Sequence, residues 1–447
     1  MDITIATIGT FVLSVQKLVA ILVLPFGAAI LRRLHLSSDL TVFLGLMTLT
    51  FCVGPLLGGY ESESLTNSLV SLFLNFSAAT IVYSALLETN EPVRVIGRVW
   101  VCAAVATSIL AVGQSAGVVP LFAVTSDNLQ YQEVVAGVQR ASGLKEDANF
   151  AAMMLVIGLI FARSTPNASR RFLSTCAILA GITATLSRMG IIVAILVMVA
   201  TAGAPKASSR SLSQRTLSRL FTAAAVAAAG LVAFALSSGN LRHYLDERTR
   251  DLRVAFHQIV SGQTADGPVS SGAERAALFR GTATIIRDKF ATGVGPGNVP
   301  QALYEEVGLY KPAHNTYLET VAIGGIFGAL AILGFFAIVM LRLRRGSWPS
   351  TLPKTGISEV RLLCVCVGLM AAVLTLTYNA FLWIPLILAT AMASASASEA
   401  GAGAKRAELR RASGRSGVDR TDGRVARKEA TRDHRPPADR QMQINKD

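Results

Sequence analysis

Long apolar runs alternate with short polar segments along most of the chain. An apolar run of about 20 residues spans the ~30 Å hydrocarbon core of a membrane as a helix. The runs lie at about 3–16, 17–31, 39–58, 64–87, 95–118, 148–163, 171–187, 188–203, 218–237, 314–341, 359–378 and 381–397. This pattern predicts an all-α, polytopic integral membrane protein with about 12 transmembrane helices. The composition agrees, since 52 % of the residues are hydrophobic and only 16 % are charged.

Two parts of this pattern need interpretation. Residues 3–31 form either one tilted span or two short spans broken at Gln16–Lys17, and both readings stay open. Residues 171–203 would measure roughly 50 Å as one helix, which exceeds the membrane core. Because both flanks of this second stretch are basic, it must cross the membrane an even number of times. We therefore expect a turn at Ser187–Gly190.

Basic residues cluster in every second loop between the spans. The clusters are Arg32 and Arg33; Arg94 and Arg98; Arg163, Arg170 and Arg171; Lys206, Arg210, Arg215 and Arg219; and Arg342, Arg344 and Arg345. The positive-inside rule places these loops in the cytoplasm, and it places the long polar loop 240–313 and Arg188 outside. The net charge of +14 follows from this arrangement, so nucleic acid is not an expected partner.

Two domains are expected. Residues 1–398 form the transmembrane domain, whose first span is uncleaved because the N-terminus lacks a basic region and a small-residue cleavage site. Residues 399–447 are rich in charge and poor in large apolar residues, so we expect a disordered cytoplasmic tail that contacts anionic lipids. The five cysteines lie inside apolar runs, and Cys364 and Cys366 face different sides of a helix. Neither a metal pair nor a disulfide is predicted.

Arg188 is the most informative single residue. A guanidinium at a helical turn near the bilayer costs several kcal/mol unless it meets an anion or water. It either reaches the lipid headgroups or binds a phosphate or diphosphate, for which its planar fork is well suited.

The long loop carries three further features. Residues 273–290 have the spacing of an amphipathic helix, with Arg275, Arg280 and Arg287 either solvated or binding a ligand. The turn Gly293–Asn298 allows a polar ligand to approach closely, although no strand precedes it as in a nucleotide site. His314 opens the next span, where it is either structural or a general base near neutral pH. No second histidine is spaced to share a metal with it.

The order of these motifs resembles the bacterial O-antigen ligase/polymerase family. The matching stretches are Asp147-Ala148-Asn149, Ser187-Arg188-Met189-Gly190, Gly272-Ala273-Glu274-Arg275-Ala276-Ala277-Leu278, Gly293-Val294-Gly295-Pro296-Gly297-Asn298 and Ala313-His314-Asn315-Thr316-Tyr317-Leu318-Glu319. The resemblance is best between about 140 and 345. Family members often have a Trp a few residues after the loop arginine, where this chain has Ala277-Leu278-Phe279.

The resemblance implies a membrane glycosyltransferase of the bacterial inner membrane whose site faces the periplasm or exterior. It would move a glycan from undecaprenyl diphosphate to a hydroxyl of a glycan or lipid-core acceptor, with inversion and without a metal or other cofactor. Its implied catalytic residues are His314, Arg188 and Arg275. The implied substrate-binding residues are Arg280, Arg287, Gly295, Asn298, Asn315, Tyr317 and Asn149.

Two alternatives remain open. A polymerase of the same family would join repeat units instead of transferring finished chains, and the sequence does not separate the two. A lipid or glycan transporter would need paired charges in mid-span, or repeated halves with broken helices. The spans are nearly free of acidic residues and show no such repeat, which favours the transferase.

Overall fold

The computed structural model describes the greater part of residues 1–397. The described residues are 4–8, 11–14, 35–58, 63–89, 92–120, 134–135, 138–145, 147–202, 271–344, 354–374, 376–377 and 380–394. The chain divides into two units, Met1–Ala397 and Ser398–Asp447, and all described residues belong to the first unit. The predicted tail, the spans predicted at 17–31 and 218–237, and the first part of the long loop lie outside the described residues.

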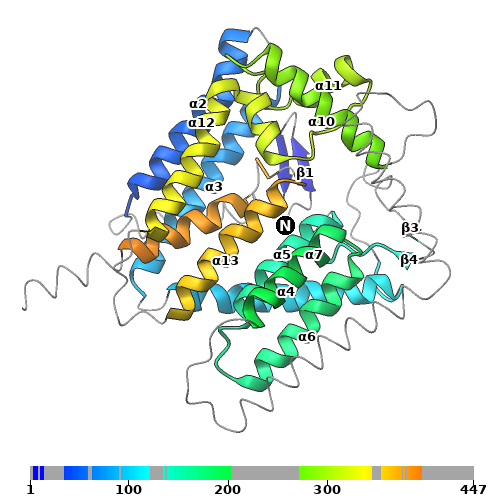
Figure 1. Cartoon of the computed structure of the whole chain (residues 1–447), viewed down its shortest axis with the longest axis vertical. Helices are drawn as coiled ribbons and strands as arrows, with labels where there is room; N and C mark the ends of the chain where they lie inside the picture. Colours follow the sequence, from blue (N-terminus) through cyan, green and yellow to red (C-terminus); the bar gives the residue numbers. More distant parts are fainter. Residues whose placement is uncertain are drawn as a thin grey trace, which may run out of the picture. The chain divides into compact units, whose positions relative to one another are not determined.

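The described residues are mainly helical (Figure 1). The elements are α2 (Ser38–Gly58), α3 (Glu63–Leu87), α4 (Pro92–Ser115), α5 (Ala148–Ala162), α6 (Ala168–Ala184), α7 (Arg188–Ala202), α10 (Ser271–Asp288), α11 (Val299–Val307), α12 (Thr316–Arg344), α13 (Lys354–Ala371), the 3-10 turn η3 (Ala380–Leu382) and a last helix, Trp383–Ser394. The turn predicted near Ser187 is confirmed, because α6 ends and α7 begins there.

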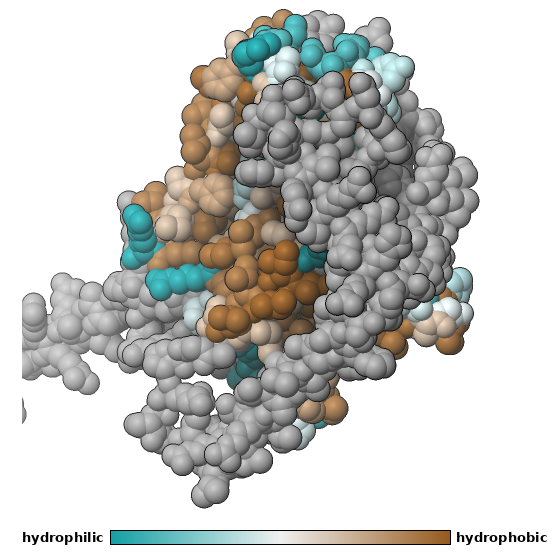
Figure 2. Space-filling view, turned by 45° about the vertical axis from the view of Figure 1, so that its right-hand side comes forward, coloured by the Kyte–Doolittle hydropathy of each residue, from teal (hydrophilic) through white to brown (hydrophobic). Residues whose placement is uncertain are grey.

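Four of the described helices are long and apolar enough to cross a membrane: Ser38–Leu57, Leu65–Leu87, Val93–Ser115 and Thr316–Arg344. Three shorter apolar helices, Ala148–Ala162, Arg188–Ala200 and Trp383–Ser394, accompany them. Large apolar side chains such as Val99 and Leu333 are exposed. In Figure 2 apolar residues cover much of the coloured surface, and hydrophilic residues lie at the end where α10 and α11 are found and in smaller groups elsewhere. These features are those of a membrane protein, while the number of twelve helices stays a prediction.

The N-terminal residues differ from the prediction. The run 3–16 was expected to be helical, but β1 (Thr4–Ile8) and β2 (Phe11–Ser14) pair as an antiparallel hairpin. Their Thr, Ile, Val and Phe residues favour a strand because branched and aromatic side chains fit the pleated backbone. A second short pair joins β3 (Val134–Val135) to β4 (Val138–Gln139). The all-α class therefore holds for the body of the domain and not for these two hairpins.

Two groups of helices build the domain. α2 packs along α12, and α4 packs against α5 and α6 while α7 packs against α5 (Figure 1). α5 is buried on nearly all sides, with Leu155, Ile157 and Ile160 almost fully enclosed. α13 contacts α5, α7 and α12 and so joins the two groups. Where α2 begins and α12 ends, Arg342 holds Asp39 through two hydrogen bonds of 2.6 and 2.8 Å.

α12 folds back on itself at Gly325, whose backbone is not helical (φ 55°, ψ −127°). The Tyr317 and Phe336 rings lie 5.9 Å apart between centroids, although a straight helix would separate them by about 28 Å. The run predicted as a span at 314–341 is therefore helical, with a sharp bend that the sequence did not predict. The 29-residue helix divides into a short arm, Thr316–Gly324, of about 14 Å and a long arm, 326–344, of about 28 Å that matches the membrane core.

Glycine explains why α12 bends at this point. Gly324 and Gly325 lie where a Cβ atom would overlap Thr50 and the carbonyl of Phe290. The Val294 and Gly295 amides donate to the carbonyls of Ala322 (2.8 Å) and Ile323 (2.9 Å). These bonds satisfy carbonyls that the short arm leaves unpaired at its end. The Gly-rich turn that follows α10 therefore covers the bend.

Candidate functional site

His314 lies in the loop that leads from α11 into the short arm of α12. It has a positive φ of 52°, an uncommon conformation for a residue with a side chain and one that is often found at functional sites. The residues before and after His314 are both fixed in place. Ala313 before it is buried, and Asn315 after it caps α12, because its Oδ1 accepts from the Leu318 amide at 3.1 Å.

The start of α12 is also tied to the break that follows α13. The span predicted at 359–378 ends early, at Ala371. Backbone groups at and just beyond this end form hydrogen bonds with side chains at the start of α12. Asn315 Nδ2 donates to the Ala372 carbonyl at 3.0 Å, and Tyr317 Oη donates to the Gly368 carbonyl at 2.6 Å. Thr316 donates to the Leu374 carbonyl and accepts from the Leu376 amide. Asn315 and Tyr317, predicted to bind substrate, thus already hold two interrupted helices together.

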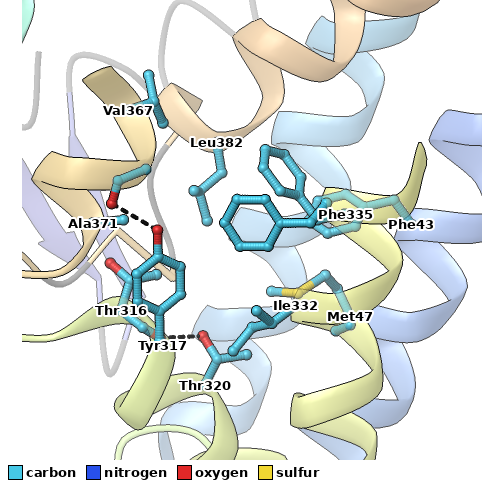
Figure 3. Close-up of a pocket in the computed structure, with 13 residues that line it drawn as sticks. Phe43, Met47, Thr316, Tyr317, Thr320, Ile332, Phe335, Val367, Ala371 and Leu382 are labelled. Carbon is cyan, nitrogen blue, oxygen red and sulfur yellow. Dashed lines mark hydrogen bonds between the residues drawn. The ribbon is translucent and has the colours of Figure 1, made fainter. Parts of the chain in front are cut away.

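An apolar cavity lies below this junction, between the two arms of α12 and beside α2 and α13 (Figure 3). Its lining includes Phe43, Met47, Phe335 and Leu382. Figure 3 shows the Tyr317 hydroxyl pointing to the end of α13 and bonded there. The cavity therefore lies between the two arms of α12, and His314 lies just before the start of the short arm.

The environment of His314 favours its neutral imidazole. Burial lowers the pKa of His314 below its ordinary value, and the positive charge of Arg275 lowers it further. Asp147 and Glu274 oppose this effect. Lys311 forms an ion pair with Glu274, so α10 is attached to the His314 loop. A neutral histidine accepts a proton at neutral pH without first losing one.

The turn that carries Arg188 is built by a second set of polar contacts. Leu186 has a positive φ of 48°, which reverses the chain between α6 and α7. Thr185 Oγ1 accepts from the Ser187 amide at 3.2 Å, and Ser187 Oγ accepts from the Gly190 amide at 3.3 Å, as an N-cap does. Ser187 Oγ also donates to Asn149 Oδ1 at 2.9 Å. Arg188 is the half-buried first residue of α7.

The start of α5 connects these two sets. Asp147 caps α5 by accepting from the amides of Asn149 (2.6 Å) and Phe150 (3.3 Å). The negative charge of Asp147 also raises the pKa of His314, while Asn149 accepts a hydrogen bond from Ser187. The structure therefore brings Asn149 to the turn of Arg188, and it gives His314 charged neighbours in Arg275 and Asp147. The sequence predicted His314, Arg275, Asn149 and Arg188 as site residues, and their common role stays a prediction.

The four other predicted residues are placed differently. Arg280 is half-buried in the middle of α10. Arg287 is 75 % exposed at the end of α10 and pairs with Asp288 at 2.7 Å. Gly295 donates to Ile323, and Asn298 Nδ2 donates to the Val294 carbonyl at 2.8 Å. The Gly-rich turn is thus bonded to α12, and a ligand-binding role for these four residues stays a prediction.

Sequence reasoning missed four charged residues of the site. Asp147 was noted only as part of a motif, and Glu274 and Lys311 were passed over beside stronger candidates. Arg140 was missed altogether, although it donates to Asn149 Oδ1 at 3.3 Å. A usable signal existed, because Arg140 is a basic residue in a loop that the predicted topology places outside, where the positive-inside rule expects few basic residues.

No three His, Cys, Asp or Glu side chains gather as a possible metal site among the residues that the structure describes. Whether the reaction needs a metal is thus left to experiment.

A family model described as O-antigen ligase matches residues 172–333, the stretch from α6 into the long arm of α12. This match includes Arg188, Arg275 and His314, and it confirms the resemblance to the O-antigen ligase/polymerase family. No curated protein matches the chain.

Proposed function

We propose that this O-antigen ligase-like membrane protein transfers a glycan from undecaprenyl diphosphate to an acceptor hydroxyl on the extracytoplasmic face. One observation carries the proposal. Half-buried His314, whose pKa is lowered by burial and by the charge of Arg275, interacts electrostatically with Asp147 at the start of α5, where Asn149 accepts from Ser187 in the turn that presents Arg188. A proton acceptor and two cations are the groups that this reaction requires.

His314 is the general base of the proposed reaction. The acceptor oxygen attacks the anomeric carbon as its proton passes to the imidazole of His314. A bond forms between that oxygen and the carbon, the bond to the diphosphate oxygen breaks, and the diphosphate leaves with the electron pair. Attack opposite the leaving group inverts the anomeric configuration. Burial of His314 supports this role, because it favours the neutral imidazole that accepts the proton.

Arg188 and Arg275 stabilise the leaving group. Charge develops on the diphosphate as its bond to the sugar breaks, and guanidinium groups bind phosphate oxygens through paired hydrogen bonds. Arg188 belongs to a turn fixed by Ser187 and Thr185, so its backbone is preorganised. Two arginines can balance this charge without a metal, which is why we propose a metal-independent reaction.

The test uses purified protein in lipid vesicles with a synthetic lipid-linked glycan donor. His314→Ala should lower the rate of transfer ~10²–10⁴-fold while donor binding persists. Arg188→Lys keeps the charge but loses the fork, so it should lower the rate by ~10-fold or more. Arg170→Lys, an exposed arginine at the other end of α6, is the matched control. Near-normal turnover per folded molecule in both site variants would exclude the catalytic roles of His314 and Arg188, and absence of transfer by the unmodified protein would exclude this function.

A polymerase uses the same chemistry with another acceptor. The envelope polysaccharide of a deletion strain distinguishes the two. Accumulation of finished lipid-linked chains indicates a ligase, and accumulation of single lipid-linked repeats indicates a polymerase.

A transporter remains the second candidate, because α12 is interrupted at Gly325 and α13 ends at Ala371, beside the start of α12. Broken helices were expected only of a transporter, and in transporters they surround substrate sites. Movement of a fluorescent lipid-linked glycan across vesicles, with no transfer to any acceptor, would support this alternative.

A further inference from the structure

The segment Arg140–Lys145 lies before the stretch that the family model matches, yet it is fixed against the site. The fully buried Gln114 of α4 holds it, since Oε1 accepts from the amides of Ser142 (3.1 Å) and Gly143 (2.7 Å). Gln114 Nε2 donates to the Gly143 carbonyl at 3.2 Å. The Ala141 amide donates to the Ala184 carbonyl at the end of α6 at 3.2 Å. The backbone of Arg140 is thus anchored beside the turn that carries Arg188.

The Arg140 side chain bridges two elements. Its Nε donates to the Thr185 carbonyl at 3.4 Å, and its Nη2 donates to Asn149 Oδ1 at 3.3 Å. Thr185 ends α6, while Asn149 lies in the first turn of α5. Asn149 Oδ1 is the same atom that accepts from Ser187 Oγ. One guanidinium therefore contacts both supports of the turn.

The turn has a physical need for this support. Leu186 adopts the left-handed conformation, which costs an L-residue roughly 1–2 kcal/mol. The Thr185 carbonyl lies at the C-terminal end of α6, where a helix presents unpaired carbonyls and partial negative charge. An arginine that donates to this carbonyl stabilises the end of the helix and the reversal that follows it.

We propose that Arg140 is a positioning residue of the donor site, which holds the Thr185–Ser187 turn so that Arg188 faces the diphosphate. The role in catalysis rests on the proposed function, whereas the support of the turn does not. Arg140 acts through the Thr185 carbonyl and Asn149. Its geometry requires two donors in one plane, which an arginine supplies and a lysine does not.

Hydrogen exchange tests the support of the turn without any substrate. In protein reconstituted in lipid, Arg140→Gln and Arg140→Lys should each increase the exchange of amides in residues 184–190 by ~5-fold or more. This factor corresponds to the loss of about 1 kcal/mol of local stability. α5 and α10 should exchange as in the unmodified protein, which checks the fold. Arg170→Gln removes an arginine from the other end of α6 and should change nothing. Unchanged exchange at 184–190 would refute the support.

Kinetics test the consequence for catalysis. Arg140→Gln should lower kcat ~10–100-fold, because a small displacement of Arg188 weakens contacts made in the transition state. The KM for the acceptor should stay within ~2-fold. Arg140→Lys should not restore kcat, since the fork and not the charge holds the turn. Recovery of kcat in the lysine variant would contradict the proposal.

A double-mutant cycle separates positioning from direct binding. If Arg140 acts through Asn149, then Arg140→Gln combined with Asn149→Ala should be little worse than the more damaging single variant. Fold-losses that multiply would show that Arg140 does not act through Asn149, and this part of the proposal would be wrong. If the unmodified protein transfers no glycan, the proposed function fails, while hydrogen exchange still decides the role of Arg140.

Discussion

Substitution of Asn315 separates a structural role from substrate binding at the start of α12. Asn315 caps α12 through Oδ1 and donates through Nδ2 to the Ala372 carbonyl. Asn315→Ala removes both bonds. Loss of an N-cap costs ~0.5–2 kcal/mol, and loss of one hydrogen bond costs ~0.5–1.5 kcal/mol. These two ranges add to an expected total of about 1–3.5 kcal/mol.

Asn315→Ser separates the contribution of the N-cap bond from that of the bond to Ala372. Serine is a good N-cap, but its side chain is too short to reach Ala372. The serine variant should therefore lose only ~0.5–1.5 kcal/mol, the share of the second bond. The free energy of unfolding in detergent measures both variants. The rate of transfer per folded molecule is then measured over a range of donor concentrations, well below the unfolding temperature. The resulting KM for the donor should stay within ~3-fold of the unmodified value.

The refuting result is specific. If Asn315→Ser were as stable as the unmodified protein and its donor KM rose tenfold or more, the amide would contact the substrate. In that case the bonds to Leu318 and Ala372 would not define its role, and the prediction from the sequence that Asn315 binds substrate would be correct.

Three further predictions concern pH, the distant ion pair and metals. Activity should persist below pH 6.5 and fall as pH drops through the lowered pKa of His314, because only the neutral imidazole accepts a proton. In pH–rate profiles, Arg275→Gln should move the midpoint of this fall upward and Glu274→Gln should move it downward; shifts in the same direction would contradict the assigned charges. Asp39→Asn should lower the free energy of unfolding by ~1–3 kcal/mol, because its two hydrogen bonds to Arg342 weaken. Turnover should stay within ~2-fold of the unmodified value. A large loss of turnover would show that the contact between the start of α2 and the end of α12 is coupled to the site. Transfer should survive EDTA, and activity that disappears and returns with Mg²⁺ or Mn²⁺ would overturn the metal-independent mechanism.

The sequence predicted those features that depend on local pattern. The turn at Ser187 followed from a run too long and too basic at both ends to be one helix. Arg188 and His314 were singled out because polar residues stand out beside apolar spans, and the resemblance to the O-antigen ligase/polymerase family added Arg275. Prediction failed where distant segments meet. The bend at Gly325 leaves the apolar content of α12 unchanged, so the hydrophobic pattern does not show it. Arg140 contacts Thr185 across 45 positions of sequence, and such a distant contact leaves no periodic pattern.

The folded-back α12 also affects how this protein can vary during evolution. A residue inserted into a helix that crosses the membrane rotates everything beyond it by about 100° and shifts it by about 1.5 Å. The short arm, Thr316–Gly324, does not itself cross, because the chain reverses at Gly325. Lengthening or shortening it would change the depth of His314 and reverse the orientation of no later helix. Related chains are therefore free to place the histidine at different depths for acceptors of different size, while the remaining helices keep their order.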